Sequence, residues 1–401
     1  MNAYLSALQS GVKRLLGAGR RSARGLLGPL YRPVRRTARF VSWAFPALGR
    51  LLLPAGANER RLLMIYDLSS QPFSIGDILV FQEASLVLRK MHNLGEVDFA
   101  IVYDPKNPGA SNPEFASITE TNVLFNLASI LPVAQVNENL GSLLVFNSYI
   151  QLHRFIADNG DFYHIWPSGW HASTREYLYY SVFNDLLYAY YRTHGSIPRL
   201  GCRPFLVDWA LLFYKKHAYP QVPVTVNIRN NKALGTHRNL DLEIWLQFFQ
   251  FCETRYPAKF VVICARSEID DRLRRCQNVI VAKDYHTGVE QDLALIHASA
   301  IHMGASSGPA TMAWFSTKPY LIVNTDLDPD LYHPALVKRE DKVIRFAFAT
   351  PAQCFIVGAE TTDLLIREFA RMWEAIDVKP WQSESDCVID SQDRVVRTWL
   401  R

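Results

Sequence analysis

The stretch Ile301–Trp314 has the sequence IHMGASSGPATMAW. An apolar run ends at Gly304, and Pro309 suits the first turn of a helix, where its missing N–H is not needed. Amides that open a helix have no partner within it and attract anions, so the stretch predicts a strand, a phosphate-binding turn and a helix. The candidate ligands are Gly304, Ser306, Ser307, Gly308 and Thr311. The alternative is an ordinary turn in which Ser307 caps the helix.

Apolar runs of strand length recur on both sides of this stretch, separated by helix-length spacers. Such alternation predicts a doubly wound parallel sheet, whose ligands bind beyond the carboxyl ends of the strands. The expected strands are 224–228, 260–264, 279–282, 300–303 and 320–324, and the expected helices are 242–256, 291–298 and 310–315. The turn after Gly304 is therefore expected at the ligand-binding edge of this sheet.

A charged residue directly follows the first of these strands. At the carboxyl end of a strand, the guanidinium of Arg229 can bind a diphosphate through two parallel hydrogen bonds. The alternative is an ion pair between Arg229 and a surface carboxylate. Asn239 and Asp241 are both candidates for the N-cap of the next helix.

Two acids, Glu290 and Asp292, lie where a helix is expected to begin. Acids are common at this position because the positive end of the helix dipole stabilises their negative charge. This effect does not require a ligand. The functional alternative is that Asp292 accepts hydrogen bonds from ribose or sugar hydroxyls.

The first half of the chain shows the same alternation. A strand at 62–66, a loop that ends in Ser74–Asp77, a helix at 78–91 and a strand at 99–103 form the pattern of a βαβ unit. The later candidates are strands at 143–146 and 162–166 and a tyrosine-rich helix at 174–193. Two prolines in Tyr219–Pro223 predict a linker between two domains.

Four short segments, in this order and spacing, resemble the donor half of a bacterial family of glycosyltransferases, which is itself similar to the GT-B-fold fucosyltransferases. The segments are Ile228–Asn230, His237–Asp241, Gln291–Leu293 and Gly304–Gly308, and a weaker similarity lies at Ser74–Asp77. The resemblance covers about 100 residues of the second half. Where the fucosyltransferase pattern has a His before its Arg and a second Arg after it, this chain has Asn227 and Asn230, so the donor sugar is left open.

The resemblance implies an α/β protein of the GT-B type, in which two Rossmann-like domains face a cleft. It implies transfer of a sugar from a nucleotide-sugar donor to a cell-surface polysaccharide or glycolipid precursor, with neither a metal requirement nor a cofactor. The residues implied to bind the donor are Arg229, Arg238, Asn239 and Asp292, together with Gly304, Ser306, Ser307, Gly308 and Thr311.

Sugar transfer needs a base that deprotonates the acceptor hydroxyl, and this base is expected in the first domain. Asp77, which follows Gly76 at a strand-to-helix turn, is the first candidate for this catalytic residue. Asp104 and His171 are the next candidates. For all three, a structural role is the alternative.

Metal and redox sites are not favoured by the sequence. The acids of the segment Asp326–Asp330 have no glycine among them to permit the sharp turn of a calcium loop, so a solvated loop is expected. The six cysteines include no C-x-x-C pair, which disfavours a zinc knuckle or a redox motif. A reducing compartment is expected.

The N-terminal segment 1–61 carries twelve Lys and Arg and one acid, whereas the rest of the chain carries 31 basic and 37 acidic residues. The net charge of +5 is too small to predict binding to nucleic acid. Apolar residues recur at helical spacing, and no apolar run approaches the roughly 20 residues of a membrane span, which predicts amphipathic helices on an anionic membrane surface. The alternatives are a disordered basic tail and a mitochondrial transit peptide.

The length of 401 residues exceeds what one core usually supports, so several domains are expected. The predicted divisions are a membrane-surface segment at 1–61, an acceptor domain at 62–220, a donor domain at 221–361 and a C-terminal helix and tail at 362–401. The expected location is the cytoplasm, peripheral on the inner face of the plasma membrane. Two other functions stay open: a sugar-nucleotide epimerase of related fold, and a non-catalytic module that binds at a membrane surface.

Overall fold

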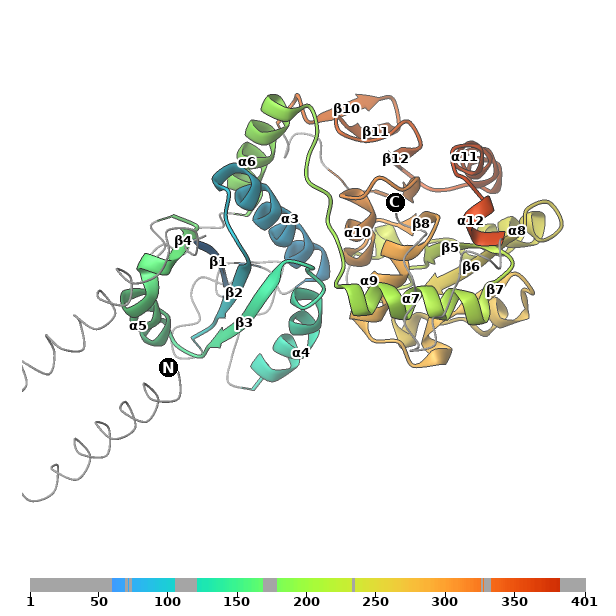
Figure 1. Ribbon diagram of the computed structural model, residues 1–401. Helices are drawn as coiled ribbons and strands as arrows, with labels where there is room; N and C mark the ends of the chain where they lie inside the picture. The colour runs from blue at the N-terminus through green and yellow to red at the C-terminus, as the bar shows by residue number, and fades with distance from the viewer. Residues whose placement is uncertain are drawn as a thin grey trace, which may run out of the picture. The chain divides into compact units, whose positions relative to one another are not determined.

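The computed structural model describes residues 60–68, 71, 74–104, 121–168, 179–232, 235–325, 327 and 333–382. Two α/β assemblies, each built on a largely parallel sheet, lie within this part of the chain (Figure 1). The predicted amphipathic helices of residues 1–59 lie outside the described residues, as do His171 and the acids at 326, 328 and 330.

The first sheet has four parallel strands in the order β3-β2-β1-β4. These are β1 (Arg61–Asp67), β2 (Val97–Val102), β3 (Leu140–Phe146) and β4 (Tyr163–Trp166). One face packs against α3 (Ile75–His92) and α4 (Val123–Ala134), and the other against α5 (Tyr149–Asn159). With both faces covered, β1 and β2 are buried along almost their whole length, as expected for strands of a parallel sheet.

The second sheet has eight strands in the order β10-β11-β12-β9-β8-β5-β6-β7. The strands are β5 (Val222–Asn227), β6 (Ala258–Ile263), β7 (Val279–Val281), β8 (Ile301–Ala305), β9 (Tyr320–Val323), β10 (Val337–Glu340), β11 (Val343–Phe346) and β12 (Gln353–Ile356). The six parallel strands follow the Rossmann order, which reverses direction between β5 and β8. That reversal is the topological switch point, where such sheets bind ligands.

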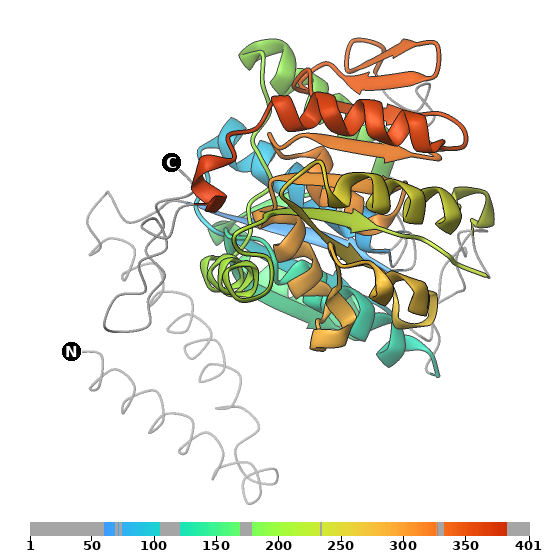
Figure 2. The same ribbon diagram turned by 90° about the vertical axis from the view of Figure 1, so that its right-hand side faces the viewer.

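Helices cover both faces of the second sheet. On one face lie α8 (Leu242–Glu253) and α11 (Thr362–Glu374), which run side by side in Figure 2. On the other lie α7 (Pro204–His217), α9 (Val289–Ala298) and the short α10 (Thr311–Trp314). The remaining helices are α6 (Tyr179–His194) and α12 (Lys379–Gln382), and single 3-10 turns connect several elements.

The predicted fold class, a GT-B-like pair of Rossmann-like α/β assemblies, is confirmed for the described residues. All five strands predicted for the second sheet are present, with ends that differ by at most two residues. Pro223, predicted in the linker, lies inside β5, where its carbonyl accepts a hydrogen bond from the amide of Ala300. The sequence analysis missed the helices α4, α5 and α7 and the short strands β10 to β12.

Candidate active site

The switch point of the second sheet is tied together by one buried amide. Asn227 is the last residue of β5, and its side-chain N–H donates to the carbonyl oxygen of Ile263 at the end of β6 (2.9 Å). Its side-chain oxygen accepts a hydrogen bond from the Ser307 hydroxyl beyond β8 (2.5 Å). The predicted phosphate turn is therefore held directly over the end of β5.

Gly304 allows β8 to approach β5 this closely. Its φ is +140°, and a Cβ atom there would stand 2.8 Å from the backbone nitrogen of Asn227 and closer still to its carbonyl oxygen. Only glycine fits without displacing backbone. This steric requirement accounts for Gly304 without a ligand, and its predicted contact with the donor stays a prediction.

The turn after β8 is compact. Ser306 is buried and its amide donates to the carbonyl of Val323 (3.2 Å), and Ser307 is extended before a 3-10 turn, η6 (Gly308–Ala310). Pro309 stands in the first turn, as predicted. Since η6 and α10 together make a short helix, its dipole is small, and we expect most of the positive charge at this edge to come from arginines.

Arg229 and Arg238 converge on the same edge. Measured from the position that a Cβ on Gly235 would occupy, a guanidinium nitrogen of Arg238 is 2.6 Å away and one of Arg229 is 3.1 Å away. The two cations are thus close neighbours, and both side chains are partly buried. Since a guanidinium can bind phosphate oxygens through two parallel hydrogen bonds, this pair is a candidate site for a diphosphate.

The loop that carries these arginines is closed by asparagines. The side chain of Asn239 accepts from the amide of Asn231 (2.9 Å) and donates to its carbonyl (2.8 Å), and the amide of Leu240 donates to the carbonyl of Arg229 (3.0 Å). Asn239, predicted to bind the donor, thereby has a structural task. The N-cap of α8 is Asp241, whose carboxylate accepts from the amide of Glu243 (2.9 Å).

Asp292 lies in the first turn of α9, and both of its carboxylate oxygens have protein partners. One accepts from the Lys283 ammonium (2.6 Å) and the other from the Thr287 hydroxyl (2.6 Å). Burial raises the pKa of Asp292 to about 6, against the opposing effect of Lys283. The predicted hydrogen bonds from Asp292 to sugar hydroxyls would have to compete with these internal partners.

Asp77 lies in the first turn of α3, beyond the end of β1. Ser74 is the N-cap of this helix: its oxygen accepts from the amide of Asp77 (3.2 Å), and its hydroxyl donates to the Asp77 carboxylate. The carboxylate is thus oriented by a neighbour one turn away. Asp104, the second candidate, is partly buried just beyond β2.

The start of α3 packs directly on the phosphate turn of the second sheet. A Cβ on Gly308 would stand 2.9 Å from the amide nitrogen of Gly76 and 2.8 Å from Cβ of Ile75. A Cβ on Gly76 would stand 3.2 Å from the hydroxyl oxygen of Thr311. A side chain at Gly308 would therefore overlap the start of α3, whereas one at Gly76 would make only a tight contact. The structure therefore brings Asp77 next to the turn at Ser307 and Gly308.

Sequence reasoning missed two residues of these edges. Asn227 appeared only as a departure from the fucosyltransferase pattern, and its bridging role depends on strand order, which the sequence does not give. Asp67, the last residue of β1, is buried and accepts a hydrogen bond from the Tyr149 hydroxyl (3.2 Å). Its position directly after an apolar strand is the same signal that pointed to Arg229.

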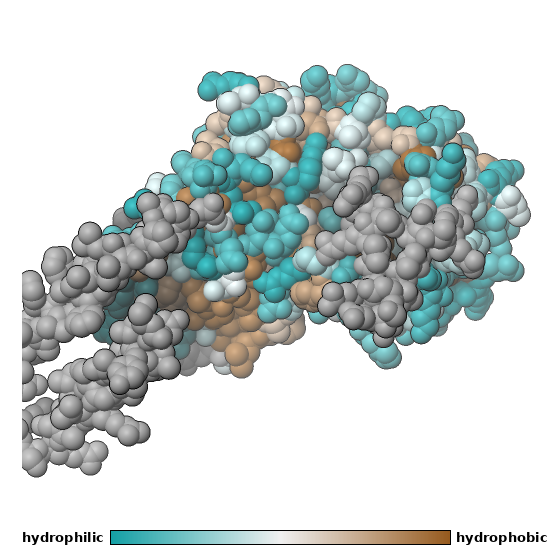
Figure 3. Space-filling model, viewed as in Figure 1, coloured by the Kyte–Doolittle hydropathy of each residue, from teal (hydrophilic) through white to brown (hydrophobic). Residues whose placement is uncertain are grey.

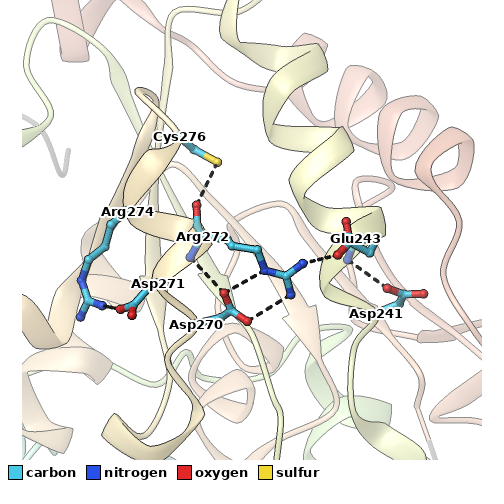
Figure 4. Close-up of polar contacts among 7 residues, drawn as sticks. All are labelled: Asp241, Glu243, Asp270, Asp271, Arg272, Arg274 and Cys276. Carbon is cyan, nitrogen blue, oxygen red and sulfur yellow. Dashed lines mark hydrogen bonds and ion pairs between the residues drawn. The ribbon is translucent and has the colours of Figure 1, made fainter.

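A separate cluster of charges braces the loop between β6 and β7 (Figure 4). Arg272 contacts both oxygens of Asp270 (3.0 and 3.1 Å) and also Glu243 at the start of α8, and Arg274 pairs with Asp271 and with Asp284 (2.7 Å). These side chains are largely exposed, so each pair contributes little to stability. Because the arginines are already paired with carboxylates, we assign the cluster a structural role.

Within the described residues, no group of three or more His, Cys, Asp and Glu side chains is placed to hold a metal ion. Among the same residues, no helix is long and apolar enough to cross a membrane. The five cysteines there are free thiols, and four of them are buried.

No protein-family model and no curated protein matches this chain. Solved structures similar to it include a glycosyl transferase of family 9 from Veillonella parvula DSM 2008, at 13% identity and a TM-score of 0.47, covering 82% of this chain and 92% of that one. Another is the ADP-heptose LPS heptosyltransferase II of E. coli, at 10% identity and a TM-score of 0.49, covering 79% and 99%. A UDP-GlcNAc 2-epimerase of Methanocaldococcus jannaschii is also similar, at 12% identity and a TM-score of 0.33, covering 78% and 92%.

Proposed function

We propose that this chain is a glycosyltransferase that moves a sugar from a nucleotide-sugar donor to a cell-surface polysaccharide or glycolipid precursor. The observation that carries the proposal is the contact between Gly76 and Gly308. It joins the residue before Asp77, in the first Rossmann-like assembly, to a turn at the switch point of the second sheet, and Arg229 and Arg238 converge at the same edge of that sheet. A base and a diphosphate site on facing elements are what transfer between two substrates requires.

In the proposed reaction, Asp77 accepts the proton of the acceptor hydroxyl, whose oxygen forms the new bond to the anomeric carbon. The bond between that carbon and the diphosphate oxygen breaks, and the leaving diphosphate takes the electron pair. Arg229 and Arg238 stabilise the negative charge that develops on it. The proposal assigns this role to arginines rather than to a metal, so we expect transfer to persist in the presence of EDTA.

We further propose that residues 1–61 hold the protein on the anionic, cytoplasmic face of the plasma membrane. The twelve Lys and Arg of this segment support the proposal, because basic residues near an anionic leaflet contribute about 1 kcal/mol each. A peptide of residues 1–61 should bind anionic vesicles at physiological salt. Absence of binding would remove the membrane from the proposal and leave the transfer reaction untouched.

A thermal-shift screen of the full chain against UDP-, GDP-, ADP-, CMP- and dTDP-sugars tests the donor site. A ligand present at about 100 times its Kd stabilises the native state by roughly 2.7 kcal/mol, which raises the melting temperature measurably. If no nucleotide sugar raises it, the donor site is wrong and the non-catalytic module becomes the better explanation.

The product of the reaction separates transfer from epimerisation. With the donor identified, a transferase releases the nucleotide in proportion to a supplied glycan acceptor. An epimerase converts the sugar nucleotide without an acceptor. Conversion in the absence of any acceptor would overturn the proposed transfer.

A further inference from the structure

One side of α7 carries a partly exposed stripe of aromatic and apolar residues and one lysine. Its members follow one another at intervals of three or four residues, which places them on one side of a helix of 3.6 residues per turn. They are Phe205, Trp209, Leu212, Lys216 and, just past the helix end, Tyr219. Phe205 is 60% exposed and Leu212 40%, whereas the opposite side of α7 is buried against the second sheet's helices.

The composition of this stripe suits a membrane surface. Aromatic rings with polar tips and leucines favour the boundary between headgroups and acyl chains, and lysines favour anionic headgroups. The last turn of α7 holds Lys215, Lys216 and His217, and Asp208 is the one acid in the helix. The stripe is therefore apolar at its start and basic at its end.

The stripe begins close to the point where the basic segment joins the described part of the chain. Arg203, which precedes α7, donates from its guanidinium to the carbonyl of Leu140 (3.1 Å). The guanidinium of Arg61 lies against the next residue, Gly141. Arg61 begins β1, and the chain up to it carries twelve basic residues and one acid.

We propose that the stripe on α7 is a second membrane contact, which rests on the same anionic bilayer as residues 1–61 and fixes the orientation of the enzyme on it. The inference rests on the membrane part of the proposed function. It adds a surface of the folded protein to a segment that would otherwise act only as a tether. Two such contacts on one bilayer strengthen each other, because the second binds at high effective concentration.

A second apolar surface serves as the comparison. Leu124 and Phe125 on α4 are each 76% exposed, and Figure 3 shows a hydrophobic patch in this part of the first assembly. This helix has no Lys, Arg, Asp or Glu over Val123–Ala134. The helix α4 begins at the carboxyl edge of the first sheet, which is opposite to the edge where β1 begins. By area alone α4 would be the better membrane contact, whereas charge and position favour α7.

The test measures sedimentation of the full chain with vesicles of phosphatidylcholine and about one third phosphatidylserine at physiological salt. The double variant Phe205→Glu and Leu212→Glu should lower the partition coefficient by about 10-fold or more, because it places two charges in the apolar boundary. The matched variant Leu124→Glu and Phe125→Glu on α4 should bind like the unmodified chain. All four residues are exposed, and melting temperatures close to that of the unmodified chain would establish that both variants fold.

Unchanged partition of the α7 variant, or a loss confined to the α4 variant, would overturn the proposal. If the α7 variant fails to fold, Lys216→Gln replaces it: a weaker salt dependence of binding supports the contact, and an unaltered one refutes it. The thermal shift with the donor is measured on the same preparations. A chain that binds the nucleotide sugar but no vesicles would refute the α7 contact together with the membrane role of residues 1–61, and would leave the transfer reaction standing.

Discussion

The carboxyl edges of the two sheets carry opposite charges. Beyond β1 and β2 of the first sheet stand the acids Asp67, Asp77 and Asp104. Beyond β5 of the second sheet stand Arg229 and Arg238, held by an asparagine-closed loop. The order of the first four strands is the same in both sheets, so strand order in this common part does not account for the difference in charge.

Under the proposed function, this difference divides the work of a transfer reaction between two copies of one fold. A proton acceptor belongs on one side of the reacting carbon and a stabiliser of negative charge on the other. The contact of Gly76 with Gly308 brings the two edges together.

The largest effect is expected at the acidic edge. Asp77→Asn removes the proposed base and should lower kcat by about 10³-fold, equivalent to about 4 kcal/mol, while the Kd of the donor changes little. Steady-state kinetics with the donor found in the thermal-shift screen, together with calorimetry, measure both quantities. Asp104→Asn is the control, since it removes the same charge from the same edge, and it should cost less than 10-fold. The reverse ranking would make Asp104 the base.

The next effect concerns the close approach of β8 to β5. Gly304→Ala should lower the free energy of unfolding by about 3 kcal/mol or more, because it adds a backbone clash to a strained φ. Gly358 also has a positive φ (+96°), but a Cβ there would meet nothing within 4 Å, so Gly358→Ala should cost only about 1 kcal/mol. Urea unfolding of both variants gives the comparison. Equal costs would mean that strand packing does not explain Gly304.

The dependence of stability on pH is expected to report on a buried histidine in the interior of the second sheet. Burial lowers the pKa of His302, whose Nδ1 lies 3.0 Å from the Thr225 hydroxyl, to about 3. The folded state therefore binds this proton more weakly than the unfolded chain, and stability is lost as the pH falls below about 6.5. From pH 7 to pH 5 the unmodified chain should lose about 2 kcal/mol more than His302→Asn.

Unfolding measured at both pH values gives this difference. Asp292, with a pKa raised to about 6, has the opposite sign and gains stability over the same range, but its contribution is common to both proteins and cancels. Parallel pH curves for the two proteins would contradict the prediction. If activity and stability fall together at low pH, unfolding of the sheet interior causes the loss of activity. If activity falls while the protein stays folded, the cause is a titrating group at one of the edges.

The smallest effect is expected at the basic edge. Arg229→Ala should weaken binding of the donor by at least about 1.5 kcal/mol, as loss of a charge-assisted hydrogen bond does, and Arg229→Lys should restore only part of it. Calorimetry with the nucleotide diphosphate measures both. Arg274→Ala, which removes a guanidinium already paired with carboxylates in the second assembly, is the control and should bind normally. Unchanged affinity in Arg229→Ala would refute the assignment of the diphosphate site.

The sequence predicted the parallel core of the second sheet well because β5 to β9 are short, apolar and separated by helix-length spacers. It missed α4, VLFNLASILPVA, because a helix without charged residues has no polar face to mark its period, and Pro132 lies inside it. It missed β10 and β11 because their sequences, VKRE and VIRF, contain charged residues and so do not form the apolar runs that marked the other strands. Arg229 and Ser307 were predicted from their positions after apolar strands, which is why the sequence could place both at one switch point.

By itself the sequence determined which residues stand at the ends of strands and which helix would begin with a serine-glycine turn. Periodicity and local chemistry act over a few residues, so these features can be read along the chain. Only the tertiary structure decided that Asn227 joins three strands, that Asp292 is occupied by Lys283, and that Gly76 lies against Gly308. These contacts join residues brought together by strand order and side-chain packing, which depend on the whole core rather than on any local pattern.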